Sequence, residues 1–262
     1  MKTSVLLYHD VIRGGDPDAI GFPGATAARY KLDWAAFVEH LEELERVTAG
    51  PPDVIDDLLA DRAGSQSWSI TFDDGGSSAL AAGEELARRG WRAHFFCVSD
   101  LVGRPGFIGV EEIAALRAMG HVIGSHSRSH PNRMSALSWP ELVEEWRASA
   151  ERLGALVGEP VLSAAVPGGS YSPVVARAAA AAGVEALFTS EPVRRARRVD
   201  GCLVVGRHAV RRTTSAATVA RAATGGRRPW LRQRAAWTVA KAAKAVGGET
   251  YARARAAVLA RR

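Results

Sequence analysis

Thr71-Phe72-Asp73-Asp74-Gly75 is the stretch on which predictions of both fold and site depend. It continues a short apolar, partly β-branched run that begins at residue 68 and is typical of a buried strand. Residues 75–78, Gly-Gly-Ser-Ser, indicate a turn and the start of a helix. Two carboxylates therefore stand where a strand ends. Because neighbouring residues of an extended chain point in different directions, one acid can ligate a metal while the other acts on a water molecule.

A second polar stretch, Gly124-Ser125-His126-Ser127-Arg128-Ser129-His130-Pro131, follows the strand-like residues 121–124. Imidazole suits zinc and its first-row neighbours, and three protein ligands with an open position mark a catalytic metal site. One aspartate and two histidines would make such a set. Another interpretation stays open on these residues alone. The acid pair would then shape a turn or cap the next helix, and the histidine pair would be structural or exposed.

Taken together, the two stretches resemble the first two motifs of the polysaccharide deacetylases, the NodB-homology or carbohydrate esterase family 4 proteins. The T-F-D-D-G and H-[ST]-x-x-H elements match without a gap and lie about fifty residues apart. The resemblance covers residues 4–214 and implies an α/β fold, a distorted and incomplete (β/α) barrel. It also implies a hydrolase that removes an N-acyl group, with N-acetyl expected first, from an amino sugar of a polysaccharide or its lipid-linked precursor.

The resemblance implies a role for each residue of these two motifs. Asp74, His126 and His130 would hold one divalent metal ion, with Zn²⁺ expected first. Asp73 would take the proton from the attacking water as general base.

Residues 166–171, Val-Pro-Gly-Gly-Ser-Tyr, occupy the place of the family's third motif. The resemblance implies that Pro167, Gly168 and Tyr171 line the substrate site, with a backbone N–H near Gly168 facing the developing oxyanion. Tyr171 can equally be an ordinary half-buried side chain. The family has an arginine two positions before this proline, which helps to hold the catalytic acid, but this chain has Ala165. How Asp73 is held in place is therefore an open question.

The family's last motif supplies a histidine that protonates the leaving amine, and His208 is the histidine nearest to that place. Its context differs from the usual L-x-H, so a surface histidine is the alternative. The adjacent Arg207 is expected to orient a carboxylate or bind an anionic substrate group. At the other end of the chain, His9 and Asp10 follow the first expected strand, residues 5–8, and can line the same pocket.

The 262 residues suffice for one large domain, with an apolar content of 47% and a charged content of 24% that are ordinary for a globular protein. Strand-like and helix-like segments alternate six or seven times, which predicts a mainly parallel sheet covered by helices. No phosphate-binding glycine motif of a nucleotide fold is present in the sequence. Cys97 and Cys202 both lie in apolar runs and are expected to be buried free thiols.

Basic charge is concentrated near the C-terminus. Residues 221–262 hold 11 of the 34 Lys and Arg and one of the 28 acids, so their net charge is +10 and that of residues 1–220 is −4. We therefore expect a deacetylase barrel over residues 1–220 and a basic helical tail over residues 221–262. The tail either packs on the barrel with a solvated basic face or makes peripheral contact with an anionic membrane. Nucleic acid is not an expected partner, because no nucleic-acid module accompanies the basic tract.

The first ten residues contain too short an apolar run for a signal peptide, and no run approaches the roughly 18 apolar residues of a membrane span. We therefore expect a cytoplasmic location, with membrane association at the inner face if the tail binds lipid.

Three other functions remain to be weighed at this point. The first is a deformylase acting on a lipid-linked amino sugar. The second is a carbohydrate-binding protein that keeps the metal without turnover, an alternative suggested by Ala165. The third is a metal-dependent phosphoesterase, which the motifs disfavour because two-metal sites need more ligands than they offer.

Overall fold

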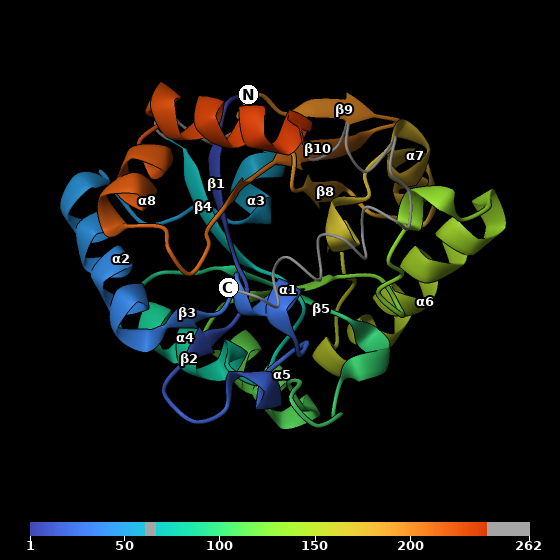
Figure 1. Ribbon diagram of the computed structural model, residues 1–262. Helices are drawn as coiled ribbons and strands as arrows, with labels where there is room; N and C mark the ends of the chain where they lie inside the picture. Colours follow the sequence, from blue (N-terminus) through green and yellow to red (C-terminus); the bar gives the residue numbers. More distant parts are fainter. Residues whose placement is uncertain (61–66, 240–262) are drawn as a thin grey trace.

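A nine-stranded sheet, curled into an incomplete barrel, forms the middle of the molecule (Figure 1). In the computed structural model, which describes residues 1–60 and 67–239, the strand order is β11-β1-β4-β5-β6-β7-β8-β10-β9. All neighbouring strands are parallel except β10 and β9, which are antiparallel. Within the described residues the two edge strands, β11 and β9, do not pair, so the barrel is not closed. The predicted α/β class and incomplete (β/α) barrel are confirmed.

The strands of this sheet, in chain order, are β1 (Ser4–Tyr8), β4 (Trp68–Phe72), β5 (His94–Cys97), β6 (Val122–Ser125), β7 (Ser163–Ala165), β8 (Ala186–Thr189), β9 (Arg197–Val199), β10 (Cys202–Gly206) and β11 (His208–Ala209). A separate pair consists of β2 (Val11–Ile12) and β3 (Leu32–Asp33).

The α-helices are α1 (Ala25–Ala28), α2 (Trp34–Val47), α3 (Ile55–Leu59), α4 (Ala79–Ala87), α5 (Val110–Ala118), α6 (Trp139–Val157), α7 (Pro173–Ala181) and α8 (Ala216–Ala223). Short 3₁₀ turns are η1 (Pro17–Ala19), η2 (Ser99–Leu101), η3 (Met134–Ala136) and η4 (Pro167–Gly169). Most of the longer helices lie around the outside of the sheet (Figure 1). No helix of the described residues is long and apolar enough to cross a membrane.

Both faces of the sheet are buried, which is why its strands are apolar along their whole length. On the outer face, Tyr8 and Phe72 pack against Phe37 of α2. On the inner face, Phe96 and Phe188 belong to a smaller cluster that includes Ile55 and Leu58 of α3. This inner cluster also contains Val5, Ala186 and Leu203, the first or second residues of β1, β8 and β10, so α3 fills the barrel near the amino ends of these strands. The carboxyl ends are left for the site.

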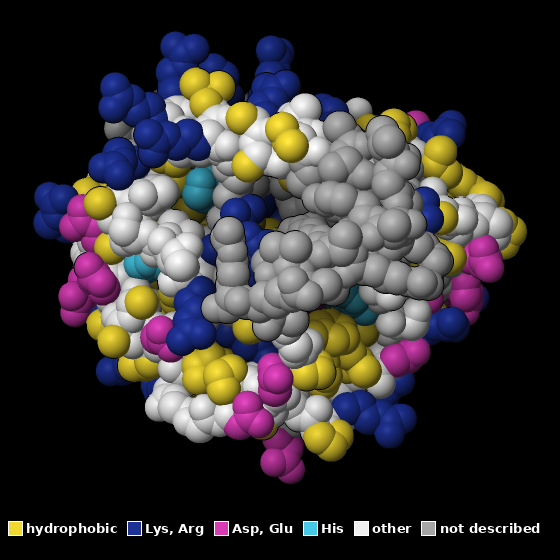
Figure 2. Space-filling view, in the orientation of Figure 1, with side chains coloured by type: hydrophobic (Ala, Val, Ile, Leu, Met, Phe, Trp, Pro, Cys, Tyr) yellow, Lys and Arg dark blue, Asp and Glu magenta, His cyan; other side chains and the backbone are white. Residues whose placement is uncertain are grey.

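The chain after α8 returns to a helical conformation over residues 227–239 and packs on the barrel. Trp230 is buried, and its indole N–H donates to the Ala222 carbonyl over 3.0 Å. The other side of this helix is basic, and Lys and Arg side chains gather over it and α8 at the upper left of Figure 2. Residues 227–239 thus have the packed arrangement with a solvated basic face, whereas residues 240–262 of the expected tail lie outside the described residues.

Helix α8 runs across the expected division between residues 220 and 221. Its last residues, Ala222 and Ala223, are buried in the same cluster as Leu6 of β1 and Leu41 of α2. The end of α8 is therefore part of the layer that covers the sheet. The division into residues 1–220 and 221–262 stays a prediction.

Gly124 in β6 packs closely against side chains of the neighbouring strands β5 and β7. A Cβ atom at this position would come within 2.5 Å of the Phe96 ring and 2.8 Å of the Ser163 hydroxyl. We expect Gly124→Ala to lower the free energy of unfolding by about 1–3 kcal/mol through overpacking. Urea unfolding measures this change. Gly50→Ala is the control, because its Cβ would meet nothing within 4 Å; equal losses in the two variants would contradict this account.

Candidate active site

The two sequence motifs meet at the carboxyl edge of the sheet. Asp73 and Asp74 follow the last residue of β4, and His126 follows the last residue of β6. Both strands are parallel to β5, which lies between them, so their carboxyl ends fall on the same edge. Among the described non-glycine residues, four have positive φ, and three of these are Asp74, Ser127 and His130. Unfavourable backbone conformations are thus concentrated in the two motif loops, as at many functional sites.

Asp74, His126 and His130 each offer one ligand atom to a common point, with all three atoms within 4.8 Å of one another. The Asp74 Oδ1 atom lies 3.3 Å from His126 Nε2 and 3.6 Å from His130 Nε2. The His126 Nδ1–H donates to the Ala165 carbonyl over 3.0 Å, which leaves Nε2 as the free ligand atom. An oxygen and two imidazole nitrogens are a donor set that fits zinc or a similar divalent ion.

Hydrogen bonds hold the histidine loop in shape. The His130 N–H donates to the Ser127 hydroxyl over 3.0 Å, and the Ser127 N–H donates to the Ser125 hydroxyl over 3.1 Å. Glu145 of α6 accepts from both the N–H and the hydroxyl of Ser129. These contacts fix the backbone from which both imidazoles project.

The Asp73 carboxylate has a different partner. Arg207, which is 0% exposed, donates from Nη1 to Oδ1 over 2.6 Å and from Nη2 to Oδ2 over 2.8 Å. The guanidinium is held in turn by the Thr71 hydroxyl and the Thr189 carbonyl, each at 3.1 Å. Such a bidentate pair fixes both the position and the plane of a carboxylate. The guanidinium absent at Ala165 is therefore supplied by Arg207, between β10 and β11.

Charges around the two acids outweigh the effect of their burial. Burial alone would raise the pKa of Asp73, but Arg207 and His126 hold it below its usual range. Burial likewise opposes ionisation of Asp74, yet His126, His9 and His130 lower its pKa. For His126 burial favours the neutral ring, but both aspartates raise its pKa. The two carboxylates of this centre therefore favour a positive charge among the neighbouring imidazole rings.

A cavity of about 520 Å³ opens in front of these groups. His9 and Asp10, from the end of β1, line it as expected. Burial and then Asp74 raise the pKa of Asp10 to about 6, although Ser78 donates a hydrogen bond to it over 2.9 Å. Aromatic side chains from distant parts of the chain form much of the remaining wall: Phe22, Tyr30 and Trp237. Such walls suit the apolar faces of a sugar ring.

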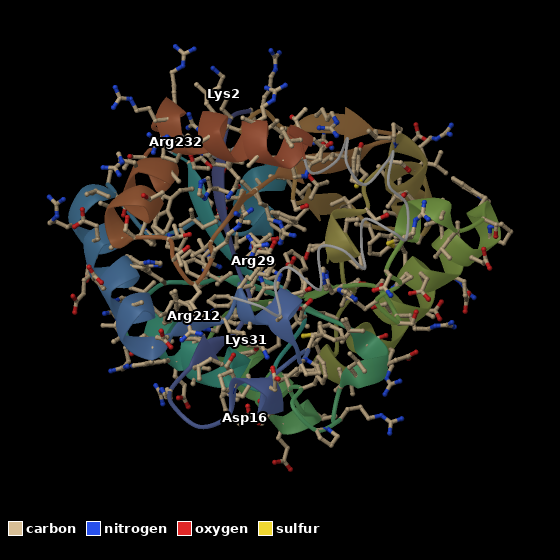
Figure 3. All side chains as sticks on the ribbon, viewed as in Figure 1. Lys2, Asp16, Arg29, Lys31, Arg212 and Arg232 are labelled. Atoms are coloured by element: carbon tan, nitrogen blue, oxygen red, sulfur yellow. The ribbon has the colours of Figure 1, made fainter. Side chains whose placement is uncertain are left out.

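The loop that supplies Phe22 and Tyr30 is fastened at both ends. The Lys31 ammonium donates to the Pro17 and Ile20 carbonyls over 2.6 Å each. The Arg212 N–H donates to the Arg29 carbonyl over 2.8 Å, and Figure 3 labels Arg29, Lys31 and Arg212 in this region. This part of the cavity wall is therefore tied to the segment that follows β11.

The structure brings together only some of the residues expected to bind substrate. Gly168 lines the cavity, whereas Pro167 is buried beside it and Tyr171 packs in a separate cluster under the Arg197 guanidinium. His208 is not among the described residues that line this cavity. Its ring is 3% exposed, packs against Trp230 with ring centres 5.5 Å apart, and lines a different cavity. Its position therefore gives no support to a role for His208 as the acid.

Residues 60–187 match the family model described as polysaccharide deacetylase. These residues form a polysaccharide deacetylase domain. The resemblance to polysaccharide deacetylases that the two motifs indicated is confirmed. As a deacetylase the protein is a hydrolase. None of the curated proteins compared with the chain matches it.

Solved structures share the fold of this deacetylase at low sequence identity. A polysaccharide deacetylase from Bacillus cereus is 20% identical, with a TM-score of 0.71 over 85% of this chain and 69% of that one. IcaB from Ammonifex degensii is 24% identical, with a TM-score of 0.70 over 86% and 97%. The deacetylase PplD from Streptococcus pyogenes, in complex with acetate, is 17% identical, with a TM-score of 0.69 over 83% and 96%.

Sequence reasoning missed most of the cavity wall. Phe22, Tyr30, Arg211, Gln233 and Trp237 come from loops and from the helix at residues 227–239, and no local pattern marks them as site residues. The deacetylase motifs were detectable because each is continuous in the chain.

We expect Arg207→Met to lower the free energy of unfolding at pH 7 by about 3–5 kcal/mol, because it leaves a buried carboxylate unpaired. The folded-state pKa of Asp73 is lowered, so the stabilisation is present above the ordinary carboxyl pKa and is lost as the pH falls. The difference between variant and wild type should therefore shrink in acid. Urea unfolding at several pH values measures both effects.

The double variant Arg207→Met with Asp73→Asn is the control, because it removes the charge along with its partner. It should be more stable than Arg207→Met alone. Additive losses would mean that the pair does not interact as described.

Proposed function

We propose that this deacetylase is metal-dependent and hydrolyses the N-acetyl group of an amino sugar in a polysaccharide or its lipid-linked precursor. The observation that carries the proposal is the meeting, in one cavity, of the Arg207-held Asp73 carboxylate with the ligand set of Asp74, His126 and His130. Zn²⁺ is the ion we propose first, because two imidazoles and one carboxylate oxygen suit it.

An ion held by Asp74, His126 and His130 would polarise the acyl carbonyl and make a water molecule more acidic. Asp73 would remove the proton from the water that attacks the carbonyl carbon. Its lowered pKa keeps it ionised at neutral pH, and the Arg207 guanidinium keeps its oxygens in place. As the C–N bond breaks, the nitrogen takes up a proton, and the products are an amine and a carboxylate.

We propose His9 as the group that gives this proton. It lines the cavity, it lies close enough to Asp73 and Asp74 to lower their pKa values, and its Nδ1 atom has no hydrogen-bond partner among the described residues. Tyr30 stacks on the ring with centres 4.7 Å apart and would orient it. His208, which packs against Trp230, has no comparable approach to the two acids.

Two of the alternatives can now be weighed. The non-catalytic sugar-binding protein was suggested by the missing arginine at Ala165, and Arg207 removes that reason. For the acyl group, the structural relative PplD carries acetate, which is the product expected from an N-acetyl substrate. This supports acetyl over formyl. The predicted cytoplasmic location, the lipid-linked form of the substrate and membrane contact through residues 221–262 stay predictions.

Elemental analysis of the purified protein, with acetate release from N-acetylated amino-sugar oligomers, tests the proposal. We expect about one divalent ion per chain, lost in His126→Ala, because one of three ligands is removed. Asp73→Asn should keep the ion but lose about 10²-fold or more in kcat. Release of formate from formylated sugars without acetate release would reassign the acyl group. An ion-free wild-type protein, or full turnover by Asp73→Asn, would reject the proposed chemistry.

His9→Gln and His208→Gln, compared at equal metal content, test the identity of the acid. We expect a loss of kcat of about 10²-fold or more in His9→Gln, because the amine must then leave without its proton donor. The loss in His208→Gln should be smaller. A larger loss in His208→Gln than in His9→Gln would restore His208 to the role that the sequence resemblance implies.

A further inference from the structure

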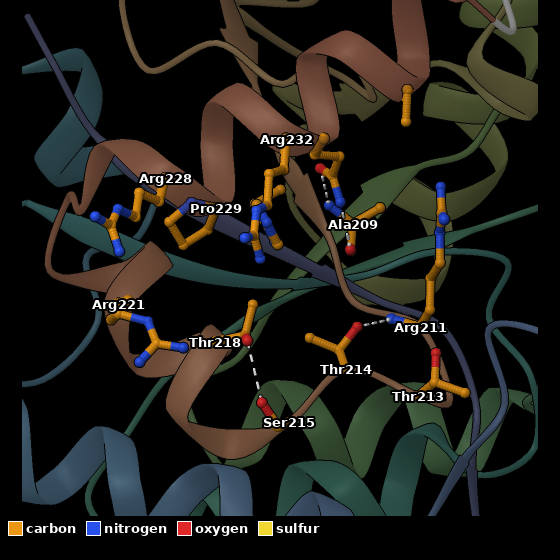
Figure 4. Close-up of a pocket in the computed structure, with 13 residues that line it drawn as sticks. Ala209, Arg211, Thr213, Thr214, Ser215, Thr218, Arg221, Arg228, Pro229 and Arg232 are labelled. Carbon is orange, nitrogen blue, oxygen red and sulfur yellow. Dashed lines mark hydrogen bonds between the residues drawn. The ribbon is translucent and has the colours of Figure 1, made fainter.

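A second cavity, of about 540 Å³, lies between the segment after β11, α8 and the helix at residues 227–239 (Figure 4). Four of its lining residues are arginines. Arg211 comes from the segment after β11, Arg221 from the last turn of α8, and Arg228 and Arg232 from successive turns of the following helix. None of the thirteen described residues that line this cavity is acidic.

These arginines have no ion-pair partner among residues 1–60 and 67–239. Arg221, Arg228 and Arg232 are exposed to solvent at the cavity, and the Nε atom of Arg211 is buried without a hydrogen bond to any described residue. Elsewhere in the described structure arginines often pair with acids, as Arg147 does with Glu144. Four guanidinium groups around one hollow repel one another unless an anion lies among them.

Other polar groups of the same cavity can complete an anion site. The hydroxyls of Thr214, Ser215 and Thr218 line it, and those of Ser215 and Thr218 lie 3.1 Å apart. His208 also lines it, although the residue is only 3% exposed, and its Nδ1 atom has no hydrogen-bond partner among the described residues. An anion bound here would supply the missing charge and hydrogen-bond acceptors.

We propose that this arginine cavity binds a phosphoryl group, as a phosphate or diphosphate ester. A carboxylate brings a single charge and two oxygens, whereas a phosphate monoester or diphosphate brings about two or more charges and at least three acceptor oxygens. Four guanidinium groups that line one cavity match the larger charge. Arginine is also the side chain whose fork of N–H donors fits phosphate oxygens in pairs.

The arginine cavity shares a wall with the catalytic cavity. Ala209, Arg211, Gln233 and Ala236 line both. Gln233 holds this wall together, because its side-chain oxygen accepts from the Ala209 N–H over 2.9 Å and its amide donates to the Ala209 carbonyl over 2.7 Å. One molecule could therefore place an amino sugar in one cavity and a phosphoryl group in the other. This extension, to a sugar phosphate or lipid-linked sugar as substrate, rests on the proposed function.

Calorimetric titration of the full chain with inorganic diphosphate tests the anion site itself. We compare two double variants. The first combines Arg228→Gln and Arg232→Gln, and the second combines Arg227→Gln and Arg234→Gln. Both variants lose two charges from one helix, but Arg227 and Arg234 line another surface. We expect the first pair to weaken binding by about tenfold or more, and the second by less than about threefold. Equal weakening, or no binding by wild type, would overturn the proposal.

Repeating the titration in His126→Ala separates this site from the catalytic one, since that variant lacks a proposed metal ligand. Diphosphate binding that persists there belongs to the arginine cavity, even if the deacetylase proposal fails. Binding lost there would assign the anion to the metal centre and overturn the phosphoryl site.

Two further probes identify the source of the phosphoryl group. Selective weakening of N-acetylglucosamine 1-phosphate binding in the Arg228 and Arg232 variant would indicate a sugar phosphate. If the same variant binds vesicles that contain anionic phospholipid more weakly than wild type does, but binds the soluble sugar phosphate equally well, the ligand is a lipid headgroup. Tight binding of glucuronate, equal to that of diphosphate, would overturn the choice of phosphoryl over carboxylate.

Discussion

Burial of a guanidinium is costly unless its N–H groups find partners, and Arg207 is wholly buried. Its partners come from two separate strands or their ends, Thr71 and Asp73 at β4 and Thr189 at β8, and Arg207 itself follows a third strand, β10. The site therefore depends on the sheet being curled, because β4 and β8, which both contact Arg207, lie four places apart in the strand order. Curvature brings this charge pair together across the barrel, and the pair keeps Asp73 ionised where burial alone would favour the neutral acid.

One backbone turn separates the roles of the two adjacent acids. Asp73 continues the extended chain and points to Arg207, whereas Asp74 has a φ of 76° and points to the two histidines. Gly75, with a φ of 69°, continues the turn. A side chain that is engaged by a guanidinium is a poor candidate for a metal ligand, and one that is surrounded by imidazoles is a good one. The difference in chemistry between the two carboxylates therefore follows from one change of backbone direction.

The sequence predicts the grouping of Asp74, His126 and His130 because each motif is local. Asp74, His126 and His130 follow strand ends, and parallel strands put those ends on one edge whatever the rest of the fold does. The contact between Asp73 and its partner does not follow from a local motif. Arg207 lies 134 positions away, and whether it reaches Asp73 depends on barrel curvature, which no local pattern encodes. The cavity wall is unpredictable for the same reason, since Phe22, Tyr30 and Trp237 meet only after the whole chain has folded.

The neighbouring residues Arg207 and His208 illustrate the limit of prediction from the sequence alone. Neighbouring residues of an extended chain face opposite sides, so only one of the two can point into the barrel. From the sequence, Arg207 was expected to orient a carboxylate or bind an anionic group and His208 to protonate the leaving amine; in the structure the Arg207 guanidinium pairs with the Asp73 carboxylate in the interior. His208 is then directed outward, beneath Trp230 and beside the arginine cavity. The alternation of one short segment therefore places the partner of Asp73, the proposed general base, on one side of the sheet and a polar wall of the second cavity on the other.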